Sequence, residues 1–530
     1  MRLIIHSQPE KLTVHSVKTT IDLSENAKAN RLLSIVKISL MKSMLFLLLI
    51  CGYAVNAQKT PEAKKYNIVV SLDSSLKGPY TGTLRLYTQK DTSRGFGGEH
   101  SLEEPAFSIP VKNWKTGESK FFDGAAHPQY AKLQDVKPGY YKMIAILDTN
   151  TTERGNNAYG NLYTRREGLL HVTDSGASGQ LVLSNVFPQR PFPSSDSIKE
   201  VVLASPLLAS FRKTAIFHKA GVYLPPSYFT KPQQEFPVVY VIPGWGGVHQ
   251  QVASGNARKL YGVGSGDEKI YVFLNPEVQT PYGLHAYVDS RVNGPWGTAL
   301  IRELMPYIQQ TFRASKDPKL TFIMGQSSGG YGALWLALHF PSSFGGAWIT
   351  APDPVDFSNF VGIDIYKDNN AFVDAQGKER GIYIINGTPQ SSIREGYIKE
   401  NFDGDGGQQQ SFEAEFGVPD KNGRPQPLYN SSGKIDRKVA ESWKPYDMAL
   451  YVKSNAAKLR KKLTGPVKIY AGSKDNFLLD KSVSSFGEKI KPLGLNIETI
   501  IIENADHFST RSEKLAAEIV KEMDSLIKRK

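Results

Sequence analysis

A short apolar run at residues 320–324 passes directly into a Gly-X-Ser-X-Gly turn and then into a helical segment at 329–340. The turn places Ser327 between Gly325 and Gly329. Strand, sharp turn and helix in this order are typical of a nucleophile elbow, in which strained backbone lifts a serine hydroxyl above a parallel sheet and small flanking residues prevent clashes. The pattern therefore predicts strands alternating with helices around this segment, and it makes Ser327 a candidate nucleophile.

A second register centred on Ser328 fits less well, since Gln326 would then stand where the first glycine is needed. The alternative to a catalytic role is a glycine-rich turn that only caps the following helix.

From about residue 200 the chain alternates apolar strands with helical segments, which predicts an α/β fold with a mostly parallel sheet over 200–530. In the closing helix, Leu515, Ile519, Met523 and Ile527 recur every four residues and form one face for packing on that sheet. Residues 353–465 carry few strand signals and are predicted to be an insertion over the sheet. Strands are predicted at 221–224, 237–242, 270–274, 320–324, 346–350, 382–385, 467–470 and 497–502, and helices at 297–312, 329–340 and from 512.

The preceding part of the chain has a different pattern. Brief β-rich runs, punctuated by Gly, Pro and Asp, fill residues 66–184 without any helical period. They predict an all-β domain, an immunoglobulin-like β-sandwich, over 58–186. The prolines within 187–199 remove backbone donors and predict a linker between the two domains.

The apolar run at 44–54 is too short to span a bilayer as a helix. A lysine precedes it and a small-residue cleavage site follows, so residues 41–57 resemble a secretory signal peptide. We therefore expect translation to start at Met41, residues 1–40 to be an artefact of an upstream start, and the protein to be secreted or periplasmic, without membrane insertion after cleavage. The alternative is a retained N-terminal anchor.

Composition narrows the function classes. The chain is 40% hydrophobic and 22% charged, which is typical of globular proteins. Its formal net charge of +13 comes from scattered Lys and Arg without a basic stripe, so we expect no nucleic-acid partner. The sole cysteine, Cys51, lies in the predicted signal peptide, so disulfides are not expected to stabilise the mature chain.

A nucleophilic serine needs a base, and in folds with this elbow an acid and then a histidine follow it in the chain. Only His339 and His507 lie beyond Ser327, and His339 falls on the helix after the elbow. His507 follows a predicted strand and is the candidate base. Asp475, a few residues beyond the strand at 467–470, is the candidate acid, ahead of the alternatives Asp480 and Asp506.

The oxyanion of an acyl-transfer intermediate requires preorganised donors, usually the N–H after the nucleophile and one from the loop after the third strand. Ser328 supplies the first candidate. The glycine-rich segment 243–247 supplies the second, for which we choose the N–H of Trp245, with Gly246 as the near alternative. This segment could also be a loop that merely turns.

Further aromatic side chains are predicted on loops near the same edge of the sheet. Tyr287 and Trp296, together with Tyr282, His285 and Trp245, could form a wall beside Ser327 that holds planar acyl groups or sugar faces. The alternative is that they pack the loops onto the core.

These residues resemble the esterase D family, which includes enterochelin esterase-like proteins, S-formylglutathione hydrolases, feruloyl and acetylxylan esterases, and mycolyltransferases. The resemblance covers roughly residues 200–525 and rests on segments 220–226, 326–334 and 472–477 and on His507. Segment 289–300, which contains Asn293, is similar to some secreted members, so Asn293 joins Tyr287 and Trp296 as a candidate substrate-binding residue. The oxyanion segment departs from the commoner His-Gly or Ser-Gly opening, because Pro243 precedes Gly244.

The resemblance implies an α/β-hydrolase fold with Ser327, Asp475 and His507 as a catalytic triad. We expect a serine esterase that cleaves a small-molecule or glycan ester, such as a feruloyl, acetyl or siderophore ester, through an acyl-enzyme. The alternatives are an acyltransferase with the same triad and a non-catalytic glycan-binding protein. Neither a phosphate loop nor an HExxH pair is present, so no nucleotide cofactor and no catalytic metal are expected.

Overall fold

The computed structural model describes residues 64–93, 95–96, 102, 104–277, 279 and 281–529. The predicted signal peptide and the segment before it lie outside these residues. Within them, no helix combines the length and the apolar character needed to cross a bilayer.

The centre of the C-terminal part is an eight-stranded sheet in the order β10-β11-β13-β12-β16-β17-β20-β21. The pairs β10–β11 and β11–β13 are antiparallel, and all later pairs are parallel. The sheet is therefore mixed but mostly parallel, as expected for an α/β-hydrolase fold. Its strands are β10 (Ile198–Ala204), β11 (Phe217–Tyr223), β12 (Val238–Ile242), β13 (Ile270–Leu274), β16 (Thr321–Gln326), β17 (Gly346–Thr350), β20 (Val467–Gly472) and β21 (Ile497–Ile502).

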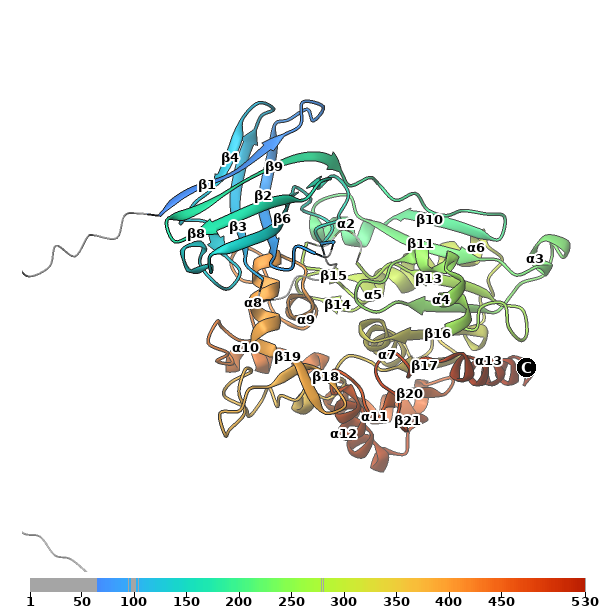
Figure 1. The fold of residues 1–530 in the computed structure, drawn as a ribbon. Coiled ribbons are helices and arrows are strands. Elements are labelled where there is room, and N and C mark those ends of the chain that lie inside the picture. Colours follow the sequence, from blue (N-terminus) through green and yellow to red (C-terminus); the bar gives the residue numbers. More distant parts are fainter. Residues whose placement is uncertain are drawn as a thin grey trace, which may run out of the picture. The chain divides into compact units, whose positions relative to one another are not determined.

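Alternate residues of the central strands enter two different cores, because successive side chains of a strand point to opposite faces. In β12, Val238 and Tyr240 pack in one core with helix α7 (Ser328–His339), whereas Val239 and Val241 pack in the other with helix α13 (Glu513–Lys528). Both faces are thus covered, which explains why β12 and β13 are apolar at every position. The sheet and its helices are seen in Figure 1.

The predicted face of the closing helix agrees with the structure. Leu515, Ile519 and Met523 of α13 are buried, and Ile527 is partly buried beside them. The predicted helix at 297–312 is divided into α5 (Trp296–Ala299), a π-helical segment (Leu300–Leu304) and α6 (Met305–Thr311). Pro306, which has no N–H to donate, stands at the start of α6.

Two strand predictions need correction. Residues 382–385 do not join the main sheet; they belong to β18 (Gly381–Ile385), which forms a separate hairpin with β19 (Thr388–Ser392). Strand β10 was not predicted, although it forms the edge of the main sheet. The remainder of the insertion contains the helices α8 (Ile393–Asp403), α9 (Gln408–Phe416), α10 (Arg437–Ser442) and α11 (Met448–Lys462), joined by long irregular segments. Helix α12 (Leu479–Ile490) follows β20.

The strands of residues 65–186 form one nine-stranded sheet in which β8 pairs with both β6 and β9. The prediction of two separate sheets is therefore wrong in detail, although the segment is all-β apart from a short 3-10 turn. Distant strands such as β1 and β2 share one core, so the sheet curls around it. The strands are β1 (Lys65–Leu72), β2 (Tyr80–Gln89), β3 (Ala106–Trp114), β4 (Ser119–Phe122), β5 (His127–Pro128), β6 (Gly139–Asp148), β7 (Leu162–Thr164), β8 (Gly168–Thr173) and β9 (Gly176–Val186).

Residues from Lys65 onward cluster into one compact unit. Residues 187–197, within the predicted linker, carry neither helix nor strand. Side chains of β2 contact the end of α8: Arg85 donates to the carbonyl of Phe402, and the Tyr87 hydroxyl donates to Asp403 over 3.0 Å.

Candidate active site

Ser327 lies at the turn between β16 and α7 in a strained backbone conformation, with φ 56° and ψ −128°. Few residues with a side chain adopt a positive φ, and the positions around it must be small. A Cβ on Gly325 would lie 2.1 Å from the carbonyl oxygen of Gly329, and one on Gly329 would lie 2.1 Å from that of Ile242. The two glycines therefore permit the sharp turn that raises the serine hydroxyl.

Asp475 and His507 lie on the loops that follow β20 and β21, the last two strands of the sheet beyond β17. Oδ2 of Asp475 is 3.0 Å from Nδ1 of His507, and both side chains are buried. The other carboxylate oxygen of Asp475 accepts hydrogen bonds from the N–H groups of Phe477 and Leu479. These bonds fix the carboxylate, which in turn can orient the imidazole.

The competing candidates are occupied elsewhere. Asp506 accepts from the N–H groups of Phe508 and Ser509, and Asp480 pairs with Lys481. His339 stacks between Trp335 and Tyr451, and burial lowers its pKa to about 4. The structure thus brings together Asp475 and His507 and leaves the other three apart.

The Ser327 hydroxyl faces an acid that the sequence did not suggest. Oγ of Ser327 is 3.4 Å from Oδ1 of Asp353, which follows β17, and none of the hydrogen bonds among the described residues joins Ser327 to His507. The Gln408 amide of α9 donates to Oδ2 of Asp353 and to Oγ of Ser328. Burial raises the pKa of Asp353 to about 6, against the opposing effects of its hydrogen bonds and of His507.

The glycine-rich loop after β12 lies against Ser327, because a Cβ on Gly244 would be 3.1 Å from Cβ of Ser327. The N–H of Gly246 donates to the carboxylate of Glu277 and is not available to a substrate. Among the hydrogen bonds of the described residues, the N–H of Trp245 has no partner. Ser328 stands at the first position of α7, where a helical N–H lacks an intrahelical acceptor. The N–H groups of Trp245 and Ser328 are thus both free to donate to a substrate.

A cavity of about 660 Å³ opens beside Ser327 and His507, and the insertion supplies most of its wall. Apolar side chains form one part of the lining and polar ones the other. The apolar part includes Val361, Ile363, Ile382, Tyr383, Ile393, Phe412 and Tyr429, and the polar part includes Asp353, Lys399, Gln408 and Gln409.

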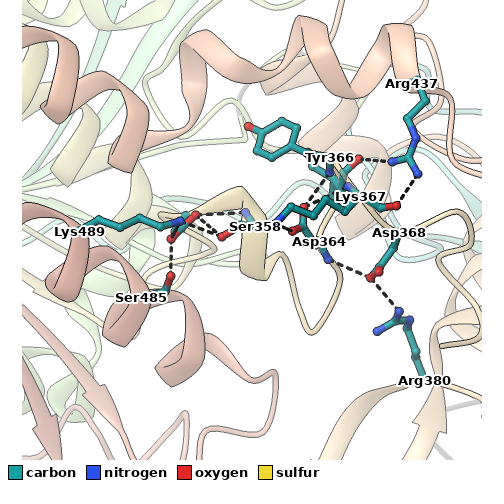
Figure 2. Close-up of polar contacts among 11 residues, drawn as sticks. Ser358, Asp364, Tyr366, Lys367, Asp368, Arg380, Arg437, Ser485 and Lys489 are labelled. Carbon is teal, nitrogen blue, oxygen red and sulfur yellow. Dashed lines mark hydrogen bonds and ion pairs between the residues drawn. The ribbon is translucent and has the colours of Figure 1, made fainter. Parts of the chain in front are cut away.

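A network of hydrogen bonds and ion pairs anchors residues 356–368, the segment that contributes Val361 and Ile363 to this wall. Figure 2 shows Arg380 and Arg437 reaching the turn at 364–368 from two sides, where Arg380 pairs with Asp368 and Arg437 binds backbone oxygens. Lys489 of α12 pairs with Asp356 and donates to Ser358. Because Val361 and Ile363 lie between these anchors, the network fixes the cavity wall to α10 and α12.

The predicted aromatic wall is not at the site, and this prediction needs correction. Trp296 is 2% exposed and Tyr287 is fully buried in the main core, and neither they nor the buried Asn293 line the cavity beside Ser327. Trp296 stacks on His285 with 3.6 Å between ring centroids and meets Tyr287 edge-on. Of the aromatics expected there, Trp245 alone lines the cavity. Packing of the loops onto the core is the correct interpretation for His285, Tyr287 and Trp296, which are all buried.

Among the described residues, no group of three or more His, Cys, Asp and Glu side chains is arranged to hold a metal ion.

The comparison with protein families decides the assignment. The model of the family described as Putative esterase matches residues 217–491, just over half of the chain. The chain belongs to this esterase family. It is therefore a carboxylic ester hydrolase, and the resemblance found in its motifs is confirmed. The non-catalytic glycan-binding interpretation is not retained.

No curated protein matches the chain. Among solved structures, the esterase is similar to a ferulic acid esterase, with 16% identity over 62% of this chain and 98% of that chain and a TM-score of 0.39. It is also similar to an S-formylglutathione hydrolase from Agrobacterium tumefaciens, with 18% identity, 63% and 95% coverage and a TM-score of 0.34. Carboxyl esterase 2 from Tuber melanosporum gives 13% identity, 64% and 89% coverage and a TM-score of 0.39.

Proposed function

We propose that this esterase acts through an acyl-enzyme on Ser327, with His507 as general base and Asp475 as the acid that orients it. The observation that carries the proposal is the 3.0 Å contact between Asp475 and His507 at the cavity that Ser327 also lines. Asp475 holds the proton on Nδ1, which leaves Nε2 free to accept the proton of the serine hydroxyl.

In the proposed reaction, the Ser327 hydroxyl turns from Asp353 to His507, which removes its proton as Oγ attacks the ester carbonyl. The N–H groups of Trp245 and Ser328 receive the developing oxyanion. His507 then gives the proton to the leaving alcohol, which leaves the acyl group on Ser327. In the second half of the reaction, His507 removes a proton from a water molecule as that water attacks the acyl carbonyl, and it then returns the proton to Oγ of Ser327.

The cavity supports a substrate with an apolar, planar part and several hydroxyl groups, such as an aromatic acyl ester of a glycan. Ile382, Tyr383 and Phe412 offer apolar and aromatic surface, while Asp353, Gln408 and Lys399 can bind hydroxyl oxygens or protons. A feruloyl glycan ester has both parts. An acetyl or siderophore ester would use less of the apolar wall.

The test is a panel of feruloyl, acetyl and siderophore esters assayed with the wild-type protein and with Ser327→Ala. We expect the highest kcat/KM on feruloyl glycan esters and no turnover above background with Ser327→Ala. Acyl transfer to a sugar acceptor at a rate above hydrolysis would assign the site to an acyltransferase instead.

We also propose export of the enzyme, on the strength of the predicted signal peptide at 41–57. The mature protein should then begin at Gln58. Intact-mass measurement of the exported protein from a bacterial host tests this. Protein that stays in the cytosol with residues 41–57 attached would contradict it.

A further inference from the structure

Arg154 belongs to the all-β segment at 65–186 and contacts the loop that carries Trp245. It lies in the loop between β6 and β7, and its guanidinium carbon is 3.7 Å from the centroid of the Trp245 ring. The same guanidinium forms a bidentate pair with Glu277, over 2.9 and 3.0 Å. Side-chain exposures of 19% for Arg154 and 11% for Glu277 make this pair better shielded than a surface ion pair.

Glu277 transmits this contact to the backbone of the glycine-rich loop. Its carboxylate oxygen Oε1, which Arg154 contacts, also accepts the N–H of Gly246. Gly246 has a φ of 83°, and a Cβ there would lie 3.1 Å from Nη2 of Arg154. Arg154 therefore restrains the loop at two points. It stacks on the Trp245 side chain, and through Glu277 it is linked to the backbone N–H of Gly246.

The loop that presents Arg154 is itself fixed. Oδ1 of the buried Asn161 accepts the N–H groups of Thr149 and Asn150, and Oδ1 of Asn150 accepts those of Thr152 and Glu153. Arg154 also packs against the insertion, since a Cβ on Gly406 would lie 2.7 Å from its Cβ. A side chain placed this firmly can restrain its partner loop at little further entropic cost.

We propose that Arg154 is a positioning residue of the esterase reaction: acting through Trp245 and Glu277, it holds the 244–247 loop so that the N–H of Trp245 stays available to the oxyanion. This gives the N-terminal sheet a role in catalysis that the family match at 217–491 does not assign. The inference rests on the proposed serine mechanism and its oxyanion donors.

The test compares Arg154→Ala, Arg154→Lys and Glu277→Gln in the full chain, with Arg190→Ala as the matched control. Arg190 is an exposed arginine, and among the described residues Arg154 is the cation that stacks on the Trp245 ring. The measurements are kcat and KM on p-nitrophenyl acetate and the affinity for phenylboronic acid, which forms a tetrahedral adduct with a serine nucleophile.

We expect Arg154→Ala to lower kcat about 10- to 100-fold, less than the 10²–10³-fold that loss of a whole donor costs, with little change in KM. The affinity for the boronate should fall by a similar factor, because its adduct uses the same donors. Arg154→Lys and Glu277→Gln should show intermediate losses, and combining Glu277→Gln with Arg154→Ala should add little. Should Arg154→Ala fail to fold, the two conservative variants carry the same test.

A wild-type kcat in Arg154→Ala, or a loss that Arg190→Ala shares, would overturn the inference. So would a fall in kcat without any loss of boronate affinity. Failure of the proposed serine mechanism would give a different result. In that case Ser327→Ala would bind the boronate and hydrolyse the ester as well as the wild-type protein does.

Discussion

Oδ2 of Asp475 lies 3.0 Å from Nδ1 of His507, although the two residues come from different loops. The neighbouring Asp506 directs its carboxylate to backbone N–H groups instead. We therefore predict that Asp475→Asn lowers kcat by about 10³–10⁴-fold, because an amide favours the wrong imidazole tautomer. Asp506→Asn is the control and should retain most of the activity. Steady-state kinetics at fixed pH checks both, and a larger loss in Asp506→Asn would mean that the acid has been misassigned.

We predict that Asp353 makes the stability of the protein depend on pH. Burial raises its pKa to about 6 from an ordinary value near 4, so the folded protein holds this proton more tightly than the unfolded chain. Burying the ionised carboxylate costs folding free energy. This cost is absent below about pH 4, where the group is protonated in both states, and fully present above about pH 6. Asp353→Asn should therefore be more stable than wild type above pH 6, by up to about 3 kcal/mol, with the difference closing towards pH 4.

Denaturant unfolding of both proteins at pH 4.5, 6 and 7.5 measures this difference. A stability gap that does not change with pH would show that Asp353 keeps an ordinary pKa.

The elbow should tolerate no side chain at Gly329. A Cβ there would lie 2.1 Å from the carbonyl oxygen of Ile242, so Gly329→Ala must displace the backbone. We expect this variant to lose about 1–3 kcal/mol or more of its free energy of unfolding and to lose esterase activity as well. Gly255, at the start of α4 (Gly255–Leu260), has open space around a Cβ, and Gly255→Ala should be neutral or slightly stabilising. Thermal melts and esterase assays compare the two, and an active, stable Gly329→Ala protein would contradict this description of the turn.

Specificity should follow the insertion and not the buried aromatics. Trp296→Ala should cost about 3–5 kcal/mol of stability and affect all esters alike, because its ring is in the core. Tyr383→Ala should lower kcat/KM for aromatic acyl esters far more than for acetate esters, because Tyr383 lines the cavity. Tyr130→Ala, at a side chain that is 68% exposed, is the control. Equal losses on both substrates in Tyr383→Ala would place acyl recognition elsewhere.

Local patterns in the sequence were enough to predict much of the site. Strand β17 and the buried face of α13 follow from apolar periodicity, and Ser327, Asp475 and His507 from their positions after strands. Asp353 and Arg154 could not be predicted in this way. Asp353 reaches Ser327 only because β17 lies next to β16. Arg154 reaches Trp245 from the loop between β6 and β7, two strands of a separate sheet. The aromatic wall failed for the same reason, since no local signal separates a loop aromatic that faces a cavity from one that packs inward.

The central claim is that Ser327 is the nucleophile, and covalent labelling tests it most directly. The full chain is treated with a fluorophosphonate, digested, and analysed by peptide mass spectrometry. We predict one adduct, on the peptide that contains Ser327, formed in step with the loss of esterase activity and strongly slowed in His507→Ala. A modified residue other than Ser327, or complete labelling with esterase activity retained, would contradict the account.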